Sequence, residues 1–371
     1  MTQVINDRER FARLQLFRSR GIGPLTYSEL MRRMGTAEKA VEVLPDLATA
    51  AGRPGVTLAH PRDVERELQV AADFGIDYVT LGEAAYPEQL AAIPDAPPVI
   101  AMRGRAELAG KPCVAIVGAR NASAAGRSFA RTVAKDLGDS GFVVVSGLAR
   151  GIDGAAHEAA LDAGTIAVLA GGIDQIYPPQ HKALYADIAE RGLIVSEQPF
   201  GMVARAQDFP KRNRIVSGLS RGIVVIEAAE RSGTLITARL AAEQGRDVFA
   251  VPGSPLDPRS RGTNGLLRKG AILVRDTQDI ISELETMSAQ SRLFEPSSLG
   301  WDVSPDQDEG QQDGLRSEIV GLLSFTPTHR DRIIAETGAG ASSVTMALLD
   351  LVLDGEAVEE TGGSYVLSAS R

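Results

Sequence analysis

Cysteine and aromatic residues are scarce in this chain. The single cysteine, Cys113, excludes an internal disulfide bond, and its place in the apolar run Cys113–Val117 favours a small core residue over a nucleophile. Aromatic residues make up only 5 % of the sequence, but hydrophobic residues make up 44 %, which supports a sizeable core. The 38 glycines suit an α/β protein with many tight turns. At 371 residues, we expect two or three domains.

Several motifs are absent, and each absence argues against a class of protein. No apolar stretch has the length needed to span a membrane, and the N-terminus is charged from Asp7 onward, unlike a signal peptide. We therefore expect a cytoplasmic protein. No Gly-x4-Gly-Lys-Ser/Thr motif occurs, which excludes P-loop ATP hydrolysis. The four histidines lie in unrelated segments without metal-ligand spacing, so we expect neither a metal nor a cofactor.

Acidic residues outnumber basic residues overall, but the distribution of charge along the chain matters more than the sum. The formal net charge is −9, which disfavours nucleic-acid binding if it is spread evenly. Residues 283–371 hold 16 acidic and 5 basic residues, which leaves 32 acidic and 34 basic residues for positions 1–282. The acidity therefore belongs to the C-terminal quarter, and the rest of the chain is slightly basic.

Residues 1–75 show the apolar spacing of helices on either side of the turn Gly21-Ile-Gly-Pro24. Helix, Gly-x-Gly turn and helix form a helix-hairpin-helix, whose turn amides can approach a nucleic-acid phosphate. A plain αα-hairpin needs the same glycines for close packing, so both interpretations stay open. A second pair of helices is expected around Ala37–Leu47 and Pro61–Phe74.

The pattern changes to short apolar runs alternating with helical stretches over residues 76–285. This is the βαβ pattern of a mostly parallel, helix-covered, Rossmann-like sheet. Nine strands are more than one Rossmann unit needs, so we expect the sheet to be extended at one edge. The runs are Tyr78–Leu81, Val99–Met102, Val114–Val117, Val143–Ser146, Ile166–Leu169, Leu193–Ser196, Ile223–Ile226, Val248–Val251 and Ala271–Val274.

The polar stretch over residues 286–313 has no sustained periodicity and predicts a flexible linker. Residues 314–371 then predict three helices and a terminal β-hairpin, which is the pattern of a winged helix. The expected recognition helix, Ser342–Leu353, contains no Lys or Arg. An acidic domain cannot release counterions from DNA, so we interpret the winged helix as a protein-contact module.

The strongest candidate for a binding site is the stretch Phe209–Ser220, which places Lys211, Arg212 and Arg214 around Asn213. A buried strand, Ile223–Ile226, follows and leads through Glu227 into a turn and a helix. Free backbone N–H groups at a helix start attract anions, and cations nearby suit a phosphate-bearing ligand. The alternative is a solvated charge cluster before an ordinary core strand. The turn consists of Ser232, Gly233 and Thr234.

Other glycine turns also follow strands. Gly118 and Arg120 begin such a turn, but the Gly-x-Gly-x-x-Gly pattern of a dinucleotide site is incomplete there. Arg127 and Lys182 are further candidate phosphate contacts, although Lys182 is equally well explained as a solvated helix-surface residue. The carboxyl ends of parallel strands meet at one edge of a sheet, where ligands bind. Few paired carboxylates and no activated nucleophile are expected there, so binding is favoured over catalysis.

Asp153 and His157 stand four residues apart after another glycine turn. They can form an acid/base pair or a helix cap with a stabilising partner. Without an obvious Ser or Cys nucleophile, we favour the structural interpretation.

Together these segments resemble the DNA-processing protein A (Smf) family of bacterial transformation and recombination mediators, over about residues 76–275. The residues that carry the resemblance are Tyr86-Pro, Pro97-Pro, Val114-Ala-Ile-Val-Gly-Ala-Arg120, Ser146-Gly-Leu-Ala-Arg-Gly-Ile-Asp153 with His157, Phe209-Pro-Lys-Arg-Asn-Arg-Ile215, Glu227 with Ser232-Gly-Thr234, and Val251-Pro-Gly253. The N-terminal helices resemble the SAM-like domain of the family, and the C-terminus resembles its winged helix.

The resemblance implies a homodimer that binds single-stranded DNA, protects incoming DNA during natural transformation, and loads a RecA-type recombinase onto strands coated by single-strand-binding protein. It implies no catalytic residue. The phosphate turn of the family corresponds to Gly118-Ala119-Arg120, where Ala119 lacks the usual hydroxyl. The lysine that the family places before Phe-Pro is absent, with Arg205 as a substitute beside Ala206. Phe209 matches an aromatic residue expected to stack on a base.

Our leading hypothesis is therefore a non-enzymatic single-stranded-DNA-binding mediator in which Phe209 stacks on a base. A Rossmann-type nucleotide phosphoribohydrolase is the alternative, with Glu227 as its only obvious carboxylate. A purely structural adaptor does not explain the cations around Asn213. The predicted DNA contacts are Gly118, Arg120, Arg127, Lys182, Lys211, Arg212, Asn213, Arg214, Ser232, Gly233 and Thr234.

Overall fold

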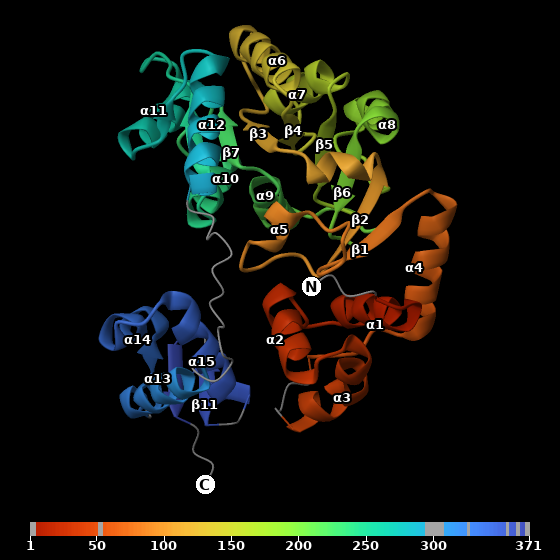
Figure 1. Cartoon of the computed structure of the whole chain (residues 1–371), viewed down its shortest axis with the longest axis vertical. Coiled ribbons are helices and arrows are strands. Elements are labelled where there is room, and N and C mark those ends of the chain that lie inside the picture. Colours follow the sequence, from red (N-terminus) through yellow and green to blue (C-terminus); the bar gives the residue numbers. More distant parts are fainter. Residues whose placement is uncertain are drawn as a thin grey trace. The chain divides into compact units, whose positions relative to one another are not determined.

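The structure, a computed structural model, describes residues 5–50, 55–293, 308–324, 327–353, 356–360 and 364–367. These residues form two compact units (Figure 1). The first contains the N-terminal helices and a nine-stranded sheet, and the second contains the C-terminal helices and a three-stranded sheet. Within the described ranges, every helix is too short or too polar to cross a membrane.

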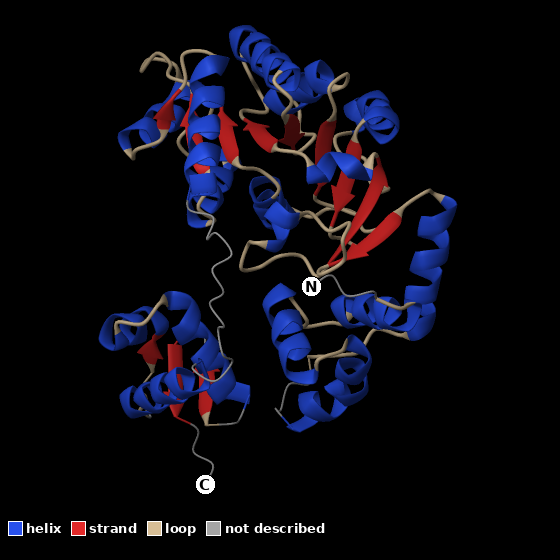
Figure 2. Ribbon diagram, in the orientation of Figure 1, coloured by secondary structure: helices blue, strands red, loops and turns tan. Residues whose placement is uncertain are grey.

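Four helices begin the chain, as the sequence predicts (Figure 2). Asn6 caps the first helix because its side-chain oxygen accepts the Glu9 N–H at 2.8 Å. Pro24 stands at the first position of the second helix, and Gly35 ends it in the left-handed conformation. The helices are α1 (Asp7–Arg18), α2 (Pro24–Met34), α3 (Ala37–Ala50) and α4 (Pro61–Asp73).

The turn between α1 and α2 packs against the segment that precedes α4. Gly21 has a φ of +83°, and a Cβ there would lie 3.0 Å from Cγ2 of Val56. Arg20 and Thr57 form an antiparallel bridge beside it. Close packing thus explains this glycine, and a contact of the turn with DNA stays a prediction.

The large sheet contains all nine strands that the sequence predicts. Seven strands run parallel. At one edge β2 pairs antiparallel with β6, and β1 pairs antiparallel with β2. The order across the sheet is β1-β2-β6-β5-β4-β3-β7-β8-β9. The strands are β1 (Asp77–Thr80), β2 (Val99–Gly104), β3 (Cys113–Val117), β4 (Val143–Ser146), β5 (Thr165–Leu169), β6 (Leu193–Ser196), β7 (Gly222–Val225), β8 (Asp247–Ala250) and β9 (Ile272–Leu273).

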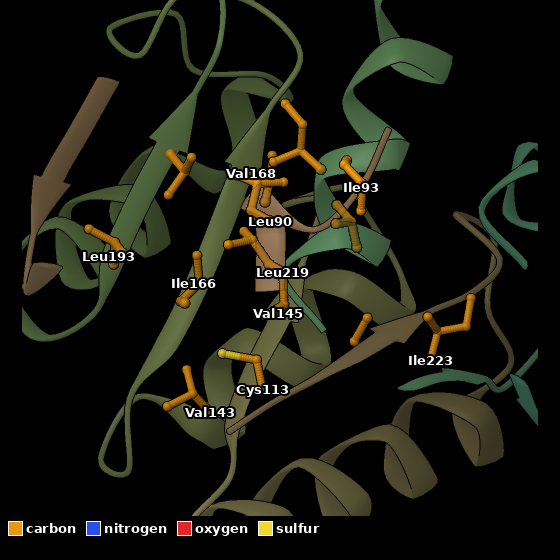
Figure 3. Close-up of a cluster of buried hydrophobic side chains, with 14 of the residues drawn as sticks. Leu90, Ile93, Cys113, Val143, Val145, Ile166, Val168, Leu193, Leu219 and Ile223 are labelled. Atoms are coloured by element: carbon orange, nitrogen blue, oxygen red, sulfur yellow. The ribbon is translucent and has the colours of Figure 1, made fainter. Parts of the chain in front are cut away.

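Helices cover both faces of this sheet (Figure 1). The helices α5, α9 and α10 pack on one face, and the helices α6, α7, α8 and α12 pack on the other. Figure 3 shows the hydrophobic core between the sheet and the helices α5, α9 and α10. Cys113 is buried there among aliphatic side chains, as expected for a core residue. The helices are α5 (Glu88–Ala91), α6 (Ala124–Asp139), α7 (Ile152–Ala160), α8 (Lys182–Arg191), α9 (Asp208–Gly218), α10 (Gly233–Glu243), α11 (Arg261–Arg268) and α12 (Thr277–Leu293).

The C-terminal unit has the helices and the hairpin of a winged helix, as predicted. Its core is built from residues of all three helices together with Ala357 and Tyr365. A short strand adds to the hairpin in the order β10-β12-β11. The elements are α13 (Asp308–Leu322), β10 (Thr328–His329), α14 (Arg330–Thr337), α15 (Ala341–Leu353), β11 (Ala357–Glu360) and β12 (Ser364–Leu367).

The predicted linker, 286–313, is wrong at both ends. Helix α12 continues to Leu293, and helix α13 already begins at Asp308. Ile280 and Leu284 anchor α12 to the sheet core, and a helix that has started can continue through polar residues. Residues 294–307 lie outside the described part of the chain.

Candidate nucleic-acid interface

The candidate site lies at the topological switch point of the sheet, between β3 and β7. Strands β3 and β7 are adjacent and parallel, but the helices that follow them, α6 and α10, pack on opposite faces. The two loops therefore diverge beyond the carboxyl ends of the strands, which is where open α/β sheets bind ligands. A cleft of about 620 Å³ opens there. It is lined by the turns after β3, β4 and β7 together with the start of α9.

The turn after β3 is held close to α7. A Cβ on Gly118 would lie 2.5 Å from Cγ1 of Ile152, so only glycine fits at this position. The Gly118 carbonyl accepts a hydrogen bond of 3.1 Å from the Thr234 hydroxyl, which joins this turn to the start of α10. Gly118 thus sets the distance between the two turns.

Arg120 extends from the same turn into solvent at the cleft. Its guanidinium carbon lies 5.2 Å from the centre of the Phe209 ring. No carboxylate within the described ranges pairs with Arg120, so its charge is available to a ligand. A guanidinium held on an aromatic face can hold a phosphate by two parallel hydrogen bonds.

The start of α10 supplies backbone donors to the cleft. Ser232 caps the helix, and its side-chain oxygen accepts the Thr234 N–H at 3.2 Å. Over the described residues, the Gly233 N–H meets no acceptor, and Gly233 is exposed. The positive end of the helix dipole lies at the same place. This turn therefore has the donors of an anion site, and the binding of DNA phosphate there stays a prediction.

Helix α9 contributes Phe209 and Asn213 to the cleft, whereas Arg212 lies beneath it. The Arg212 guanidinium donates to the carbonyl oxygens of Gly147 at 2.5 Å and Val168 at 2.6 Å. Burial lowers the pKa of Arg212 to about 10, so it stays charged at neutral pH. A Cβ on Gly147 would lie 2.3 Å from Nη1 of Arg212. Arg212 therefore ties the ends of β4 and β5 together as the floor of the cleft.

Four predicted contacts lie outside the lining of the cleft. Arg127 is exposed and donates to the Ala122 carbonyl at 2.6 Å. Lys182 borders a separate hollow with Arg103 and Tyr185. Lys211 is exposed and lies 3.5 Å from Asp208. The fourth, Arg214, is buried.

Arg214 belongs to a buried ion pair between α9 and the loop after β6. Its guanidinium donates to the Glu197 carboxylate and lies 3.4 Å from Asp95. Burial raises the pKa of Glu197, and the Arg214 charge opposes that rise. From the other side, Arg18 of α1 donates to the Glu197 carbonyl at 3.0 Å and pairs with Glu67. The pair thus links the N-terminal helices to the helix that carries Phe209.

Two arginines at the cleft were missed from the sequence. Arg231 is exposed at the lip of the cleft, and no acidic partner is found for it in the described ranges. Arg259 also lines the cleft and pairs with Asp257 at 2.9 Å. Arg231 directly precedes the Ser-Gly-Thr turn, so its position in the sequence could have indicated it. Nothing local to Arg259 indicates the cleft, because it follows a different strand.

The predicted carboxylate of the alternative enzyme is engaged elsewhere. Glu227 accepts the Ser123 N–H at 2.9 Å and the Ser123 hydroxyl at 2.5 Å. A Cβ on Gly126 would lie 2.6 Å from the same carboxylate. Glu227 therefore holds the start of α6 and does not line the cleft.

Asp153 and His157 have separate structural roles. Asp153 accepts the N–H groups of Gly147 and Ala149, which closes the turn after β4. His157 is buried, and its Nδ1 lies 2.7 Å from the Thr165 hydroxyl oxygen. Burial lowers the pKa of His157 to about 3, so the ring is neutral at physiological pH. The favoured structural interpretation fits these contacts.

Three family models match the chain. Residues 77–285 match the model described as DNA recombination-mediator protein A, which contains every element of the cleft. Residues 7–70 match the DprA-like N-terminal HHH domain, and residues 303–363 match the DprA winged helix domain. Protein Smf of Escherichia coli is 39 % identical over 287 residues, which cover 75 % of this chain and 74 % of that protein.

Two solved structures extend this similarity to three dimensions. DNA processing protein A of Streptococcus pneumoniae matches with a TM-score of 0.62 at 34 % identity, covering 76 % of this chain and 99 % of that one. DNA processing protein A of Helicobacter pylori matches with a TM-score of 0.52 at 32 % identity, covering 58 % of this chain and 97 % of that one. The Helicobacter structure concerns the single-stranded DNA binding mode of that protein.

Proposed function

The chain belongs to the DprA/Smf family of DNA recombination mediators, and from this premise we propose that it binds single-stranded DNA in the cleft. The observation that carries the proposal is the Arg120 guanidinium over the Phe209 ring, in a cleft that the exposed Gly233 at the start of α10 also lines. A cation and a helix start bind phosphate, and an aromatic ring stacks on any base. This combination favours binding that is largely independent of sequence.

The proposal extends to partners and assembly. As a mediator, the protein protects incoming DNA during natural transformation and transfers it from single-strand-binding protein to a RecA-type recombinase. We propose a homodimer, which the exposed apolar residues Leu256 and Leu273 support. Leu273 lies on the edge strand β9, and unpaired edges favour association. A pull-down of RecA-type recombinase, with and without residues 295–371, tests the partner.

We propose a non-enzymatic role over the nucleotide phosphoribohydrolase. Such an enzyme needs a carboxylate poised at a ribose, but Glu227 is held by Ser123 outside the cleft lining. Asp153, the acidic residue that does line the cleft, accepts two turn amides. Incubation with nucleoside monophosphates should therefore release no free base. Release that depends on Glu227 would favour the enzyme.

Replacing Phe209 by Ala is expected to weaken binding to oligo-dT by about 1–3 kcal/mol, the value of stacking one base on an aromatic ring. The dependence of affinity on salt should stay the same, because stacking releases no counterions. Fluorescence anisotropy at two salt concentrations measures both quantities. Phe209 is half-buried, so a melting curve serves as the control for folding. A lower salt slope with unchanged affinity at low salt would contradict the stacking role.

Deleting residues 295–371 is expected to leave the affinity for single-stranded DNA unchanged or slightly higher. The acidic residues concentrated beyond position 282 repel a DNA backbone within about 10 Å, the Debye length at 0.1 M salt. The deletion begins after α12, so the core of the first unit is kept. Titrations of single-stranded and duplex DNA with both proteins test this. If the winged helix bound DNA, the deletion would instead lower the affinity at least about tenfold, or 1.4 kcal/mol.

A further inference from the structure

An exposed tyrosine stands beside the cleft on the loop after β5. Tyr177 is 55 % exposed. Its ring meets the Phe209 ring edge to face, with the centres 5.6 Å apart and the planes at 65°. Phe209 thus contacts Arg120 and Tyr177, and the second of these contacts leads away from the cleft.

Two arginines lie beside this aromatic pair. Arg120 and Arg150 line a small hollow together with Tyr177, Pro178 and Phe209. Arg150 is exposed on the turn after β4, and it has no ion-pair partner among the residues the structure describes. An exposed ring with two unpaired cations beside it is the arrangement that binds single strands: the cations hold phosphates and the ring holds a base.

The order of the strands connects this hollow to the cleft. The adjacent strands β7, β3, β4 and β5 contribute, in turn, the Ser232 turn, Arg120, Arg150 and Tyr177. Neighbouring strands lie about 4.8 Å apart, so three steps across the sheet span about 14 Å of its carboxyl edge. This length accommodates more than the single nucleotide that Phe209 can stack.

We propose that Tyr177 is a second base-stacking residue, so that the strand leaves the cleft over the Phe209–Tyr177 pair and passes Arg150. This inference rests on the proposed binding of single-stranded DNA and adds the path that the strand takes. Lys182 and Arg103, which border a separate hollow, are not part of this path.

The matched control is Phe74. Among the described residues it is the other exposed aromatic residue, at 49 %. It packs against Phe200 with ring centres 5.2 Å apart, so the two aromatic pairs are alike in geometry. A carboxylate oxygen of Glu67 accepts the Phe200 N–H at 3.4 Å, and Arg18 is paired with that carboxylate, so the charge of Arg18 is not available to a phosphate. The variant Phe74→Ala therefore measures the effect on DNA affinity of losing an exposed aromatic ring outside the proposed path.

The first experiment measures the affinity of the full chain for oligo-dT from about 2 to about 20 nucleotides, which brackets common site sizes. Tyr177→Ala should weaken binding of the longer oligonucleotides by about 5-fold to 150-fold. The shortest oligonucleotides fill only the cleft, so they should bind Tyr177→Ala with the same affinity as the wild type. Tyr177→Phe and Phe74→Ala should retain wild-type affinity at every length. Equal affinity of Tyr177→Ala and wild type across the series overturns the proposal.

A second measurement separates stacking from support of Phe209. In a Trp301→Phe background, a Tyr177→Trp variant should lose fluorescence when long oligo-dT binds, because a base stacks on the indole. A Phe74→Trp variant should not change. An unquenched Trp at position 177 in a protein that binds oligo-dT overturns the proposal. If the wild type binds no oligo-dT at all, the proposed function itself fails, and this inference fails with it.

Discussion

Replacing Arg120 by Ala is expected to weaken binding to oligo-dT by about 2–3 kcal/mol, or roughly 30-fold to 150-fold. The guanidinium is exposed, unpaired among the described residues and fixed over the Phe209 ring. Its removal deletes one charge-assisted phosphate contact and also the cation that holds the stacking ring. The slope of log affinity against log salt should fall by about 0.7 for the lost contact. Titrations at several salt concentrations measure both effects.

Arg127 provides the matched comparison for Arg120. Arg120 lies on the turn that precedes α6 and Arg127 in the first turn of that helix, and both are exposed, but Arg127 already donates to the Ala122 carbonyl and lies outside the cleft lining. Arg127→Ala should therefore cost much less affinity and leave the salt slope nearly unchanged. Equal losses for the two variants would mean that the strand follows a different route. An Arg120→Ala protein that binds like the wild type would remove the site altogether.

Replacing Glu197 by Ala is expected to lower the free energy of unfolding by about 3 kcal/mol. Removing one partner of a buried ion pair leaves the other charge uncompensated, which typically costs about 3–5 kcal/mol. Asp95 stays near Arg214 and keeps the cost at the lower end of that range. Nη1 of Arg214 is already buried without a hydrogen-bond partner, so the guanidinium has few contacts that could replace the lost carboxylate. Urea denaturation measures the change.

Asp95 is the control for Glu197, because both carboxylates pair with the same guanidinium. The Asp95 side chain is 41 % exposed, and exposed pairs contribute about 0–1 kcal/mol. Asp95→Ala should therefore have a small effect. Replacing Glu197 and Arg214 together by Met should recover most of the stability, since apolar side chains of similar volume often substitute for a buried pair. A Glu197→Ala protein as stable as the wild type would contradict this account.

The same pair has a consequence for binding. Helix α9 carries Phe209 and Asn213 on the side that lines the cleft and Arg214 on its buried side. Arg18 reaches the Glu197 backbone from the N-terminal helices. Loss of the pair should therefore reduce affinity for DNA even in conditions where the chain is folded, because the stacking ring is no longer held at the cleft.

The sequence by itself determined the strands, the helices and the two turns of the site. Short runs rich in Val and Ile between glycine turns are typical of buried strands, and all nine strands of the large sheet were predicted. Gly118 and Ser232 act within their own turns, through close approach and capping, so local sequence was enough to indicate them. The parallel order β4-β3-β7, and the antiparallel pairing of β1 and β2, follow from contacts between distant segments and were not predicted.

Only the tertiary structure separated the cations of the Phe209–Ser220 stretch. These residues form a helix, in which each residue is turned by about 100° from the one before it. Consequently Lys211 points to solvent, Arg212 reaches the ends of β4 and β5, and Arg214 meets Glu197. Neighbours in sequence thus have three different environments, while Arg120 and Phe209, 89 positions apart, come into contact. A side chain's role depends on which face of its helix the sheet covers, and that is a property of the packed fold.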